Sequence, residues 1–252
     1  MSSTQPGERT LRVVGLNLMH GGGRRVDALA DAITRLEADV AVLTEFRPMG
    51  ARASELLTTL HTAGLKYAEW TPPPDPLVPN GVAIVSRTPF ASVGHPLASS
   101  PNAHRVLQVE LPGIDIVGVY FPLDAPKVRF WREEFLPWVG TRLGSPTLVM
   151  GDWNSGRHHV DEVGDTLLAS DEFASMASTG WTDAWRAIHS DGREYTWYSR
   201  PWWNGFRLDH AFLTPALVPR LLDARYDHTT RPDRADIRVT VSDHSAIVVD
   251  LR

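Results

Sequence analysis

The most apolar stretches of this 252-residue chain are interrupted, or end, at polar side chains that suit metal binding and proton transfer. These side chains are Asn17, Glu45, the pair Asp152 and Asn154, Asp209, and the pair Asp243 and His244. If the ends of those stretches converge, four carboxylates share a poorly solvated cleft, where unpaired like charges cost several kcal/mol. A cation must then neutralise them, and all-oxygen ligands favour Mg²⁺, Mn²⁺ or Ca²⁺ over zinc.

Each of these residues, taken singly, also has a purely structural interpretation. An Asn or Asp at a strand end is commonly a turn former or a helix N-cap. His244 alone is more often a hydrogen-bonded structural histidine than a catalyst. The repetition of the pattern along the chain favours one shared site.

Short apolar runs predict the strands that position these residues. Several runs are apolar almost without alternation, as expected for strands covered on both faces. The runs are Leu11–Met19, Val40–Phe46, Gly81–Ser86, Val106–Leu111, Ile114–Phe121, Thr147–Met150, Leu208–Leu213 and Ser245–Leu251.

Helix-period segments lie between the runs, at Val26–Ala38, Ser54–Ala63 and Val128–Leu143. About eight strands with interposed helices predict a layered α/β domain with helices outside the sheets. The strands extend over the whole chain, so we expect one domain over residues 11–252, preceded by a flexible segment over residues 1–10.

Composition excludes several classes of protein. With 42% hydrophobic residues and nine Trp, the chain is not a disordered tail. It has no Cys, and therefore no disulfide, thiolate nucleophile or Cys-type metal site. No apolar run approaches the ~20 residues of a membrane span, and residues 1–10 lack the apolar segment of a secretory signal, so a cytoplasmic location is the default expectation. The net charge of −5 is unlike that of a protein that coats nucleic acid.

Six motifs in order resemble the endonuclease/exonuclease/phosphatase superfamily, from about Leu11 to Leu251. They are Leu16-Asn17, Thr44-Glu45, Val119-Tyr120-Phe121-Pro122, Gly151-Asp152-Trp153-Asn154, Arg207-Leu208-Asp209 and Ser242-Asp243-His244-Ser245. Tyr120, where the lipid and inositol phosphatases usually have His, makes the chain most similar to the exonuclease III and apurinic-endonuclease branch.

The resemblance implies a four-layer α/β sandwich, with two mixed sheets packed face to face and helices outside. It also implies hydrolysis of phosphodiester or phosphomonoester bonds with Mg²⁺ or Mn²⁺, and a role in DNA repair. Transferred to this sequence, the metal site comprises Glu45 as principal ligand, Asn17 beside it, and Asp243 as a ligand or support.

The same resemblance implies the catalytic roles. Asp152 orients and deprotonates the attacking water, and Asn154 holds that water or the phosphate. His244 lies against the scissile phosphate and is oriented by Asp209, while Tyr120 contacts the phosphate. The chemistry agrees, because phosphodiester hydrolysis needs a positioned water, a proton acceptor and positive charge at the developing anion.

Three positions depart from the apurinic-endonuclease pattern. Leu16 replaces a Trp, Met19 replaces an Asp, and Leu123 stands where a polar residue usually follows the Tyr-x-Pro segment. These departures weaken the case for abasic-site cleavage and for a second metal.

Two further segments contain candidate substrate-binding residues. Trp202, Trp203 and Arg207 occur in a loop-like segment where aromatic rings can stack on bases and arginine can bind the backbone. The alternative is that these aromatics pack the rim of the sandwich. Arg157 and His158 follow Asn154 closely and suit a phosphate-binding set.

We therefore expect a metal-dependent DNA nuclease of exonuclease III type, monomeric and without an implied protein partner. One alternative keeps the active site but assigns it a small phosphodiester, a phospholipid headgroup or RNA, which the net charge of −5 favours. A second alternative is a catalytically silent binding module, which the intact set of acids disfavours.

Overall fold

The apolar runs form the strands of two six-stranded sheets in the computed structural model, which describes residues 10–49, 51–77, 79–239 and 241–252. The first sheet has the order β14-β15-β1-β2-β4-β3 and the second the order β10-β13-β8-β7-β6-β5. The first comprises β1 (Leu11–Asn17), β2 (Val40–Phe46), β3 (Tyr67–Trp70), β4 (Gly81–Ser86), β14 (Leu221–Asp227) and β15 (Ala246–Leu251). The second comprises β5 (Ala91–Gly94), β6 (Val106–Leu111), β7 (Ile114–Tyr120), β8 (Thr147–Asp152), β10 (Thr182–Asp183) and β13 (Asp209–Leu213).

The central strands are apolar on both faces because each face lies against a different core. In β1, Val13 points into the core between the two sheets, while Val14 and Leu16 point into the core under the helices. Side chains of a strand alternate between its faces, so two buried faces require a nearly continuous apolar run. This explains the sequence pattern of β1, β2, β4 and β7.

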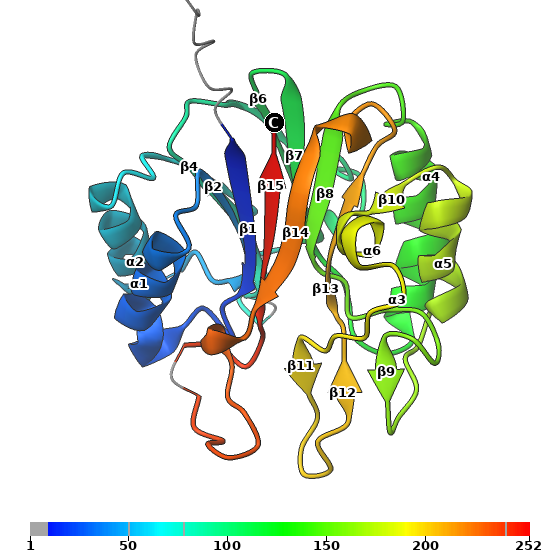
Figure 1. The fold of residues 1–252 in the computed structure, drawn as a ribbon. Helices are drawn as coiled ribbons and strands as arrows, with labels where there is room; N and C mark the ends of the chain where they lie inside the picture. Colours follow the sequence, from blue (N-terminus) through cyan, green and yellow to red (C-terminus); the bar gives the residue numbers. More distant parts are fainter. Residues whose placement is uncertain (1–9, 50, 78, 240) are drawn as a thin grey trace, which may run out of the picture.

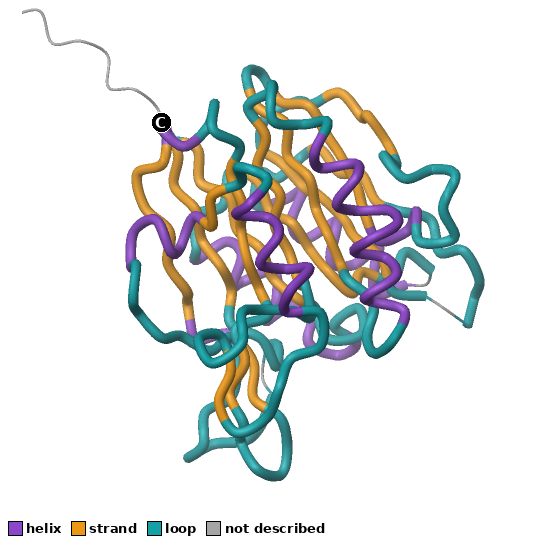
Figure 2. Tube along the Cα trace, turned by 90° about the vertical axis from the view of Figure 1, so that its right-hand side faces the viewer, coloured by secondary structure: helices purple, strands orange, loops and turns teal. Residues whose placement is uncertain are grey.

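Helices form the two outer layers, as Figures 1 and 2 show. Leu29 and Ile33 of α1 and Leu56 of α2 pack on the first sheet. Aromatic side chains, including Trp131 and Phe173, cover the outer face of the second sheet. The outer helices are α1 (Val26–Arg35), α2 (Ala51–Thr62), α3 (Pro126–Arg129), η3 (Phe130–Phe135), α4 (Leu136–Gly140) and α5 (Ser170–Ser178). The remaining helix, α6 (Ala184–His189), contacts β13 and β14, and its Ala184 and Trp185 belong to the core between the sheets. Short 3₁₀ turns cover Gly23–Arg25, Ala103–Arg105, Val218–Arg220 and His228–Thr230.

A third, small sheet has the order β11-β12-β9. It is formed by β9 (Glu162–Val163), β11 (Trp197–Tyr198) and β12 (Gly205–Phe206), and it lies at the lower end of the sandwich in Figure 1. The loop between β11 and β12 projects from this end.

The predicted four-layer sandwich of two mixed sheets with outer helices is confirmed. The bounds of three strands agree with the prediction: β2 (Val40–Phe46), β4 (Gly81–Ser86) and β6 (Val106–Leu111). The prediction missed β3, β5 and β14, which carry exposed or mixed side chains, as strands at or near sheet edges do.

The single helix predicted over Val128–Leu143 is three consecutive segments, α3, η3 and α4. The middle segment, η3, is π-helical and ends two residues before Pro137. Proline has no N–H to donate to the preceding turn, and a widened turn accommodates that loss.

Among the described residues, no helix is long and apolar enough to cross a membrane. The flexible segment expected at residues 1–10 falls almost entirely outside the described residues, and the single domain over 11–252 stays a prediction.

Candidate active site

Strand register brings the polar residues of the two sheets to one end of the sandwich. In the second sheet, Asp152 at the end of β8 lies opposite Tyr120 of β7 on one side and Asp209 of β13 on the other. In the first sheet, Asn17 at the end of β1 pairs with Thr44, next to Glu45. Of these residues, Glu45, Tyr120 and Asp152 line a cleft with a volume of about 400 Å³.

Glu45 points into the cleft because of an irregularity in β2. The register between β2 and β4 shifts between Thr44 and Phe46, and Glu45 has a φ of 55°, in the left-handed region. A bulge of this kind turns one side chain out of the strand's alternation. The Glu45 carboxylate accepts hydrogen bonds from the His20 N–H (2.6 Å) and from Asn80 Nδ2 (3.1 Å).

Asp152 is a buried carboxylate held by two amides. It accepts hydrogen bonds from Asn17 Nδ2 (2.9 Å) and from the Asn154 backbone N–H (3.0 Å). Burial raises the pKa of Asp152 to about 7, and the neighbouring Asp209 carboxylate adds to the rise, while His244 opposes it. A carboxylate with a pKa near neutrality is suited to accept a proton in catalysis.

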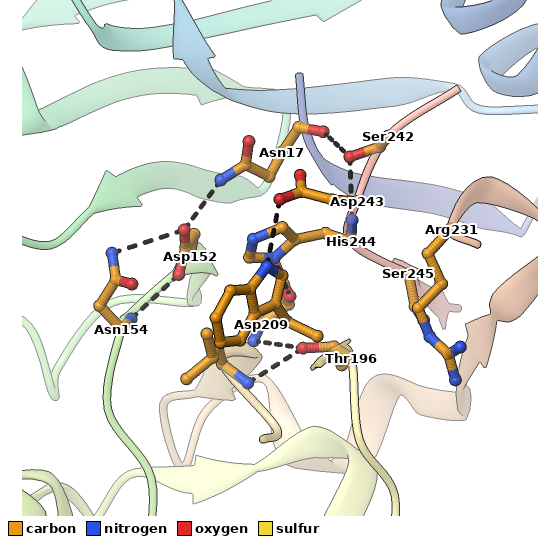
Figure 3. A network of polar contacts seen from close by, with 12 residues as sticks. Asn17, Asp152, Asn154, Thr196, Asp209, Arg231, Ser242, Asp243, His244 and Ser245 are labelled. Carbon is orange, nitrogen blue, oxygen red and sulfur yellow. Dashed lines mark hydrogen bonds and ion pairs between the residues drawn. The ribbon is translucent and has the colours of Figure 1, made fainter. Parts of the chain in front are cut away.

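His244 and Asp209 form a buried ion pair beside Asp152, with 2.8 Å between His244 Nδ1 and Asp209 Oδ2 (Figure 3). Burial by itself lowers the pKa of His244, but the Asp209 carboxylate outweighs it and raises the pKa to about 10. The ring is therefore an imidazolium at neutral pH. Thr196 Oγ1 accepts a hydrogen bond from the backbone N–H of Asp209 (3.2 Å), and Ser242 Oγ accepts one from the backbone N–H of His244 (3.0 Å). These two bonds fix the backbone at both residues of the ion pair.

Asn154, Tyr120 and Lys127 complete the wall of the cleft. Asn154, with a φ of 46°, donates through Nδ2 to the Phe121 carbonyl (3.0 Å), and its own carbonyl accepts the Lys127 ammonium. Burial lowers the pKa of Lys127, although the Asp152 charge opposes the shift. Burial also raises the pKa of the Tyr120 hydroxyl, which keeps this group a proton donor.

Several carboxylates are placed so that they can hold a metal ion. Ligand atoms of Asp152, Asp209 and His244 lie within 4.8 Å of one another. Glu45 and Asp243 line the same cleft, and Trp197 Nε1 donates to Asp243 Oδ2 (3.1 Å). The donor set is dominated by carboxylate oxygen, which fits a hard divalent cation.

Asn17 links the acid of the first sheet to the acid of the second. Its Nδ2 donates to Glu45 Oε1 (3.2 Å) and to Asp152 Oδ2 (2.9 Å). Its Oδ1 accepts the Met19 N–H (2.7 Å) and keeps a second lone pair, so ligation of a metal ion by Asn17 stays a prediction.

The expected substrate-binding residues lie in different surroundings. Trp202 is 79% exposed on the loop between β11 and β12, and Trp203 lines a smaller cavity next to the cleft. Arg157 is exposed, and His158 Nδ1 lies 3.1 Å from Glu162 Oε1, so neither lines the cleft as described.

The structure corrects the expectation for Arg207. Its guanidinium is fully buried, with Nε 2.7 Å from Asp161 and Nη2 2.7 Å from Asp183. A side chain with no exposed surface cannot contact the substrate. Arg207 instead joins the segment before β13 to β10 and to the chain after β8.

Sequence reasoning missed two residues that contact Glu45, His20 and Asn80, and it gave no site role to Lys127, which lines the cleft. Asn80 directly precedes β4, so it stands at a strand start and not at a strand end. Since β4 runs antiparallel to β2, the start of β4 lies beside the end of β2, where Glu45 is. The sequence signal for Asn80 was therefore a polar residue at the start of a strand that pairs antiparallel with the strand of Glu45.

Comparison with known proteins agrees with this fold and site. The model of the Endonuclease/Exonuclease/phosphatase family matches residues 16–244. The DNA repair nuclease APEX1 of Danio rerio is 24% identical over 180 residues, which cover 60% of this chain. The match spans 56% of that relative's length, little more than half of it.

Solved structures show the same fold. An AP endonuclease from Archaeoglobus fulgidus superposes with a TM-score of 0.79 at 21% identity, covering 96% of this chain and 99% of that one. The 3' phosphatase NExo from Neisseria, with a product DNA hairpin bound, gives 0.77 at 22% identity, and the 3'-5' exonuclease NExo from Neisseria meningitidis gives 0.76 at 23%. Both also cover 96% of this chain and 99% of theirs.

The two-sheet fold, with a cluster of acids and a histidine at one end, is thus the fold of the AP endonuclease and exonuclease structures named above. The chain belongs to the Endonuclease/Exonuclease/phosphatase family.

Proposed function

We propose that this protein is a DNA nuclease of exonuclease III type that depends on Mg²⁺ or Mn²⁺. The observation that carries the proposal is the buried Asp152, with a pKa raised to about 7 by burial, in the same cleft as the imidazolium of His244. One group is poised to accept a proton, and the other to donate a hydrogen bond to an anion.

Asp152 acts as the general base in this proposal. Its carboxylate takes a proton from the attacking water, and the side chain of Asn154 holds that water or a phosphate oxygen beside it. His244, held at Nδ1 by Asp209, presents its other ring nitrogen to the phosphate. Because His244 is already charged, no reorganisation is needed as negative charge develops on the phosphoryl oxygens.

Glu45 and Asp243 would hold the cation, since His244 and Asp209 already pair with each other. When bound, a hard divalent cation supplies Lewis-acid charge that stabilises the developing anion and the leaving oxygen. Tyr120, whose hydroxyl lies 3.5 Å from Glu45 Oε1, is placed to donate to the phosphate on the same side.

DNA is the preferred substrate because of the relatives and of the aromatic loop. The named relatives are a DNA repair nuclease, an AP endonuclease and an enzyme with a product DNA hairpin bound. Trp202 is exposed on the loop between β11 and β12, Trp203 lines the smaller cavity next to the cleft, and accessible aromatic rings stack on bases of any sequence.

A small phosphodiester is the second candidate substrate. The net charge of −5 favours it, because long nucleic acids are attracted by a basic surface. The apolar cleft residues Leu123, Leu167 and Leu168 also suit a compact ligand.

A cleavage panel tests the proposal. The substrates are blunt, recessed and abasic duplexes, single-stranded DNA, RNA and bis-p-nitrophenyl phosphate, each with Mg²⁺ or Mn²⁺ and again with EDTA. We expect metal-dependent cleavage of DNA that EDTA abolishes. Turnover of the small diester alone would retain the active site and remove DNA as the substrate, and no turnover of any diester would overturn the proposal.

A further inference from the structure

The serine that follows His244 joins the two chain segments of the His244–Asp209 ion pair. Ser245 has no exposed surface, and its backbone N–H donates to the Thr196 carbonyl (2.9 Å). Thr196 is also the residue whose hydroxyl accepts the backbone N–H of Asp209. A change in the position of Ser245 is therefore transmitted to both members of the pair, which lie together in Figure 3.

The Ser245 hydroxyl is held by an arginine and a histidine from the segment after β14. Arg231 Nε donates to Ser245 Oγ (2.8 Å), and His228 Nδ1 lies 2.7 Å from the same oxygen. Arg231 Nη2 lies 3.3 Å from His228 Nδ1. Because an arginine only donates, this ring nitrogen is the unprotonated one, and the Ser245 hydroxyl donates to it. The ring proton is then on Nε2, which lies 3.1 Å from Glu194.

Arg231 is also bound to the segment that leads into β11. Its Nη2 donates to the Tyr195 carbonyl (3.4 Å), and Tyr195 directly precedes Thr196. The guanidinium lies over the Tyr198 ring, 4.7 Å from the ring centre, and its Nη1 donates to the Pro232 carbonyl (3.2 Å). Neighbours from its own chain thus engage the guanidinium on its edge and on its face.

The turn before Arg231 holds the backbone on the other side of His244. Thr230 Oγ1 donates to the His244 carbonyl (2.8 Å), and the Thr230 carbonyl accepts the N–H of Ser242 (2.8 Å). The backbone N–H of Ala246 donates to Thr230 Oγ1 (2.9 Å). Residues 230 and 231 together therefore contact the chain before, at and after His244.

From these contacts we propose that Arg231 is a positioning residue, which acts through Ser245 to fix the orientation of the His244 imidazolium in the cleft. The inference rests on the proposed nuclease function, in which that imidazolium faces the phosphate. Arg231 acts on the rate without touching the substrate, because a misplacement of about 1 Å at a catalytic group can cost up to about 10²-fold.

The first test is kinetic and uses the best diester substrate of the cleavage panel. We expect Arg231→Met and Ser245→Ala each to lower kcat by about 10-fold and to change KM by less than about 2-fold. The double variant should be no slower than either single one, because both remove the same contact. Ser245→Ala removes one oxygen that no substrate can reach, so it keeps the test decisive if Arg231→Met lowers stability.

Arg238→Met is the matched control for the loss of charge. Arg238 belongs to the same connection between η5 and β15, and its exposed side chain pairs with Asp236 (2.6 Å). It lines neither the cleft nor the smaller cavity beside it. This variant should match the wild type in kcat and KM.

The second test asks whether Arg231 acts through His244. In a His244→Asn background there is no imidazolium to orient, so adding Arg231→Met should cost no further rate. A further 10-fold loss in that background, on the order of the loss in the wild type, would show that Arg231 acts on another group and would overturn the inference.

The third test needs no activity. In protein labelled with ¹⁵N-histidine, the His244 ring N–H that is bonded to Asp209 is identified by its absence from His244→Asn. Its exchange with water should be about 10-fold faster in Arg231→Met and in Ser245→Ala than in the wild type, because a looser pair opens more often. Arg238→Met should leave the exchange unchanged.

The outcomes separate this inference from the nuclease proposal. If Arg231→Met raises KM while kcat and the exchange of the His244 proton stay at wild-type values, Arg231 contacts the substrate; the inference is overturned and the nuclease function stands. If the wild type cleaves no diester with either metal, the nuclease function fails, and the exchange rates alone then support or overturn the positioning role.

Discussion

At the scale of single residues, the pKa values of two buried groups of the site are both raised, for different reasons. Burial of Asp152 outweighs its amide donors and the nearby His244 imidazolium, so its pKa rises to about 7. His244 has a carboxylate in direct contact, so its pKa rises to about 10 in spite of burial. One group thereby becomes a base near neutral pH and the other a permanent cation.

Asp152→Asn should therefore lower the cleavage rate by about 10³-fold or more while leaving the fold intact. The amide keeps the shape of the side chain, but it can neither accept a proton nor aim the water. Initial rates with Mn²⁺ or Mg²⁺ and thermal unfolding curves check the two parts. Asp191→Asn, which changes an exposed carboxylate after α6, is the control and should match the wild type. Full activity in Asp152→Asn would refute the mechanism.

At the scale of elements, a buried ion-pair network joins the parts of the chain around β13. Arg207 contacts Asp161 and Asp183, and Arg186 Nη2 lies 2.6 Å from Asp161. Burial alone raises the pKa of Asp161 and of Asp183, but the Arg207 charge outweighs it and lowers both. The network holds the start of β13, and with it Asp209, in register with β8.

Arg207→Met should reduce the free energy of unfolding by about 3–5 kcal/mol at pH 7, because two buried carboxylates lose a partner. In the wild type the folded-state pKa values of both are below their unfolded values, so the stabilisation is present above about pH 4 and disappears as pH falls through the folded values. In Arg207→Met, burial without the arginine charge should raise the pKa of these carboxyls above the unfolded values, so the variant regains stability as they take up protons. Its deficit relative to the wild type should therefore shrink as pH is lowered from 7 towards 4.

Urea unfolding of the wild type and of Arg207→Met at a series of pH values measures this deficit. Arg129→Met is the control, because Arg129 pairs with Glu133 on an exposed helix face and should leave stability unchanged. A deficit that is constant with pH would show that Arg207 contributes packing rather than charge pairing.

At the scale of the whole molecule, the protein is acidic, with a net charge of −5, and its candidate site is not a basic patch. Among the described residues that line the cleft and the smaller cavity beside it, four are cationic (Lys127, His244, Arg200 and Arg231) and four are acidic (Glu45, Asp124, Asp152 and Asp243). In the proposed nuclease, attraction to DNA would therefore be local, with few phosphates contacted.

The salt dependence of DNA binding should consequently be shallow. Each neutralised phosphate contributes about −0.9 to the slope of log K against log salt concentration, so four cations predict a slope no steeper than about −4. Fluorescence anisotropy titrations in EDTA, at salt concentrations from about 50 to 200 mM, measure this slope. A slope near −8 would require an extended basic surface beyond the two cavities.

The sequence by itself determined the layered α/β class and most of the candidate site. Glu45, Asp152 and Asp209 were recognisable because buried parallel and antiparallel strands are apolar on both faces, so that a polar residue stands out in them. The ordered motifs containing these residues were the basis for the family resemblance, and the family is now shown. Local pattern sufficed, since each motif lies within one strand and the turn after it.

Only the tertiary structure decided which polar groups face one another. Asn80 and His20 contact Glu45 through antiparallel pairing and a loop, and Arg207 is withdrawn from solvent by acids 46 and 24 residues away. The smaller cavity beside the cleft likewise forms where the Arg231 guanidinium stacks over the Tyr198 ring. Neither residue spacing nor side-chain type encodes such contacts, because they depend on how distant segments pack. Burial then decides whether an arginine can bind a substrate or instead neutralises buried acids of its own chain.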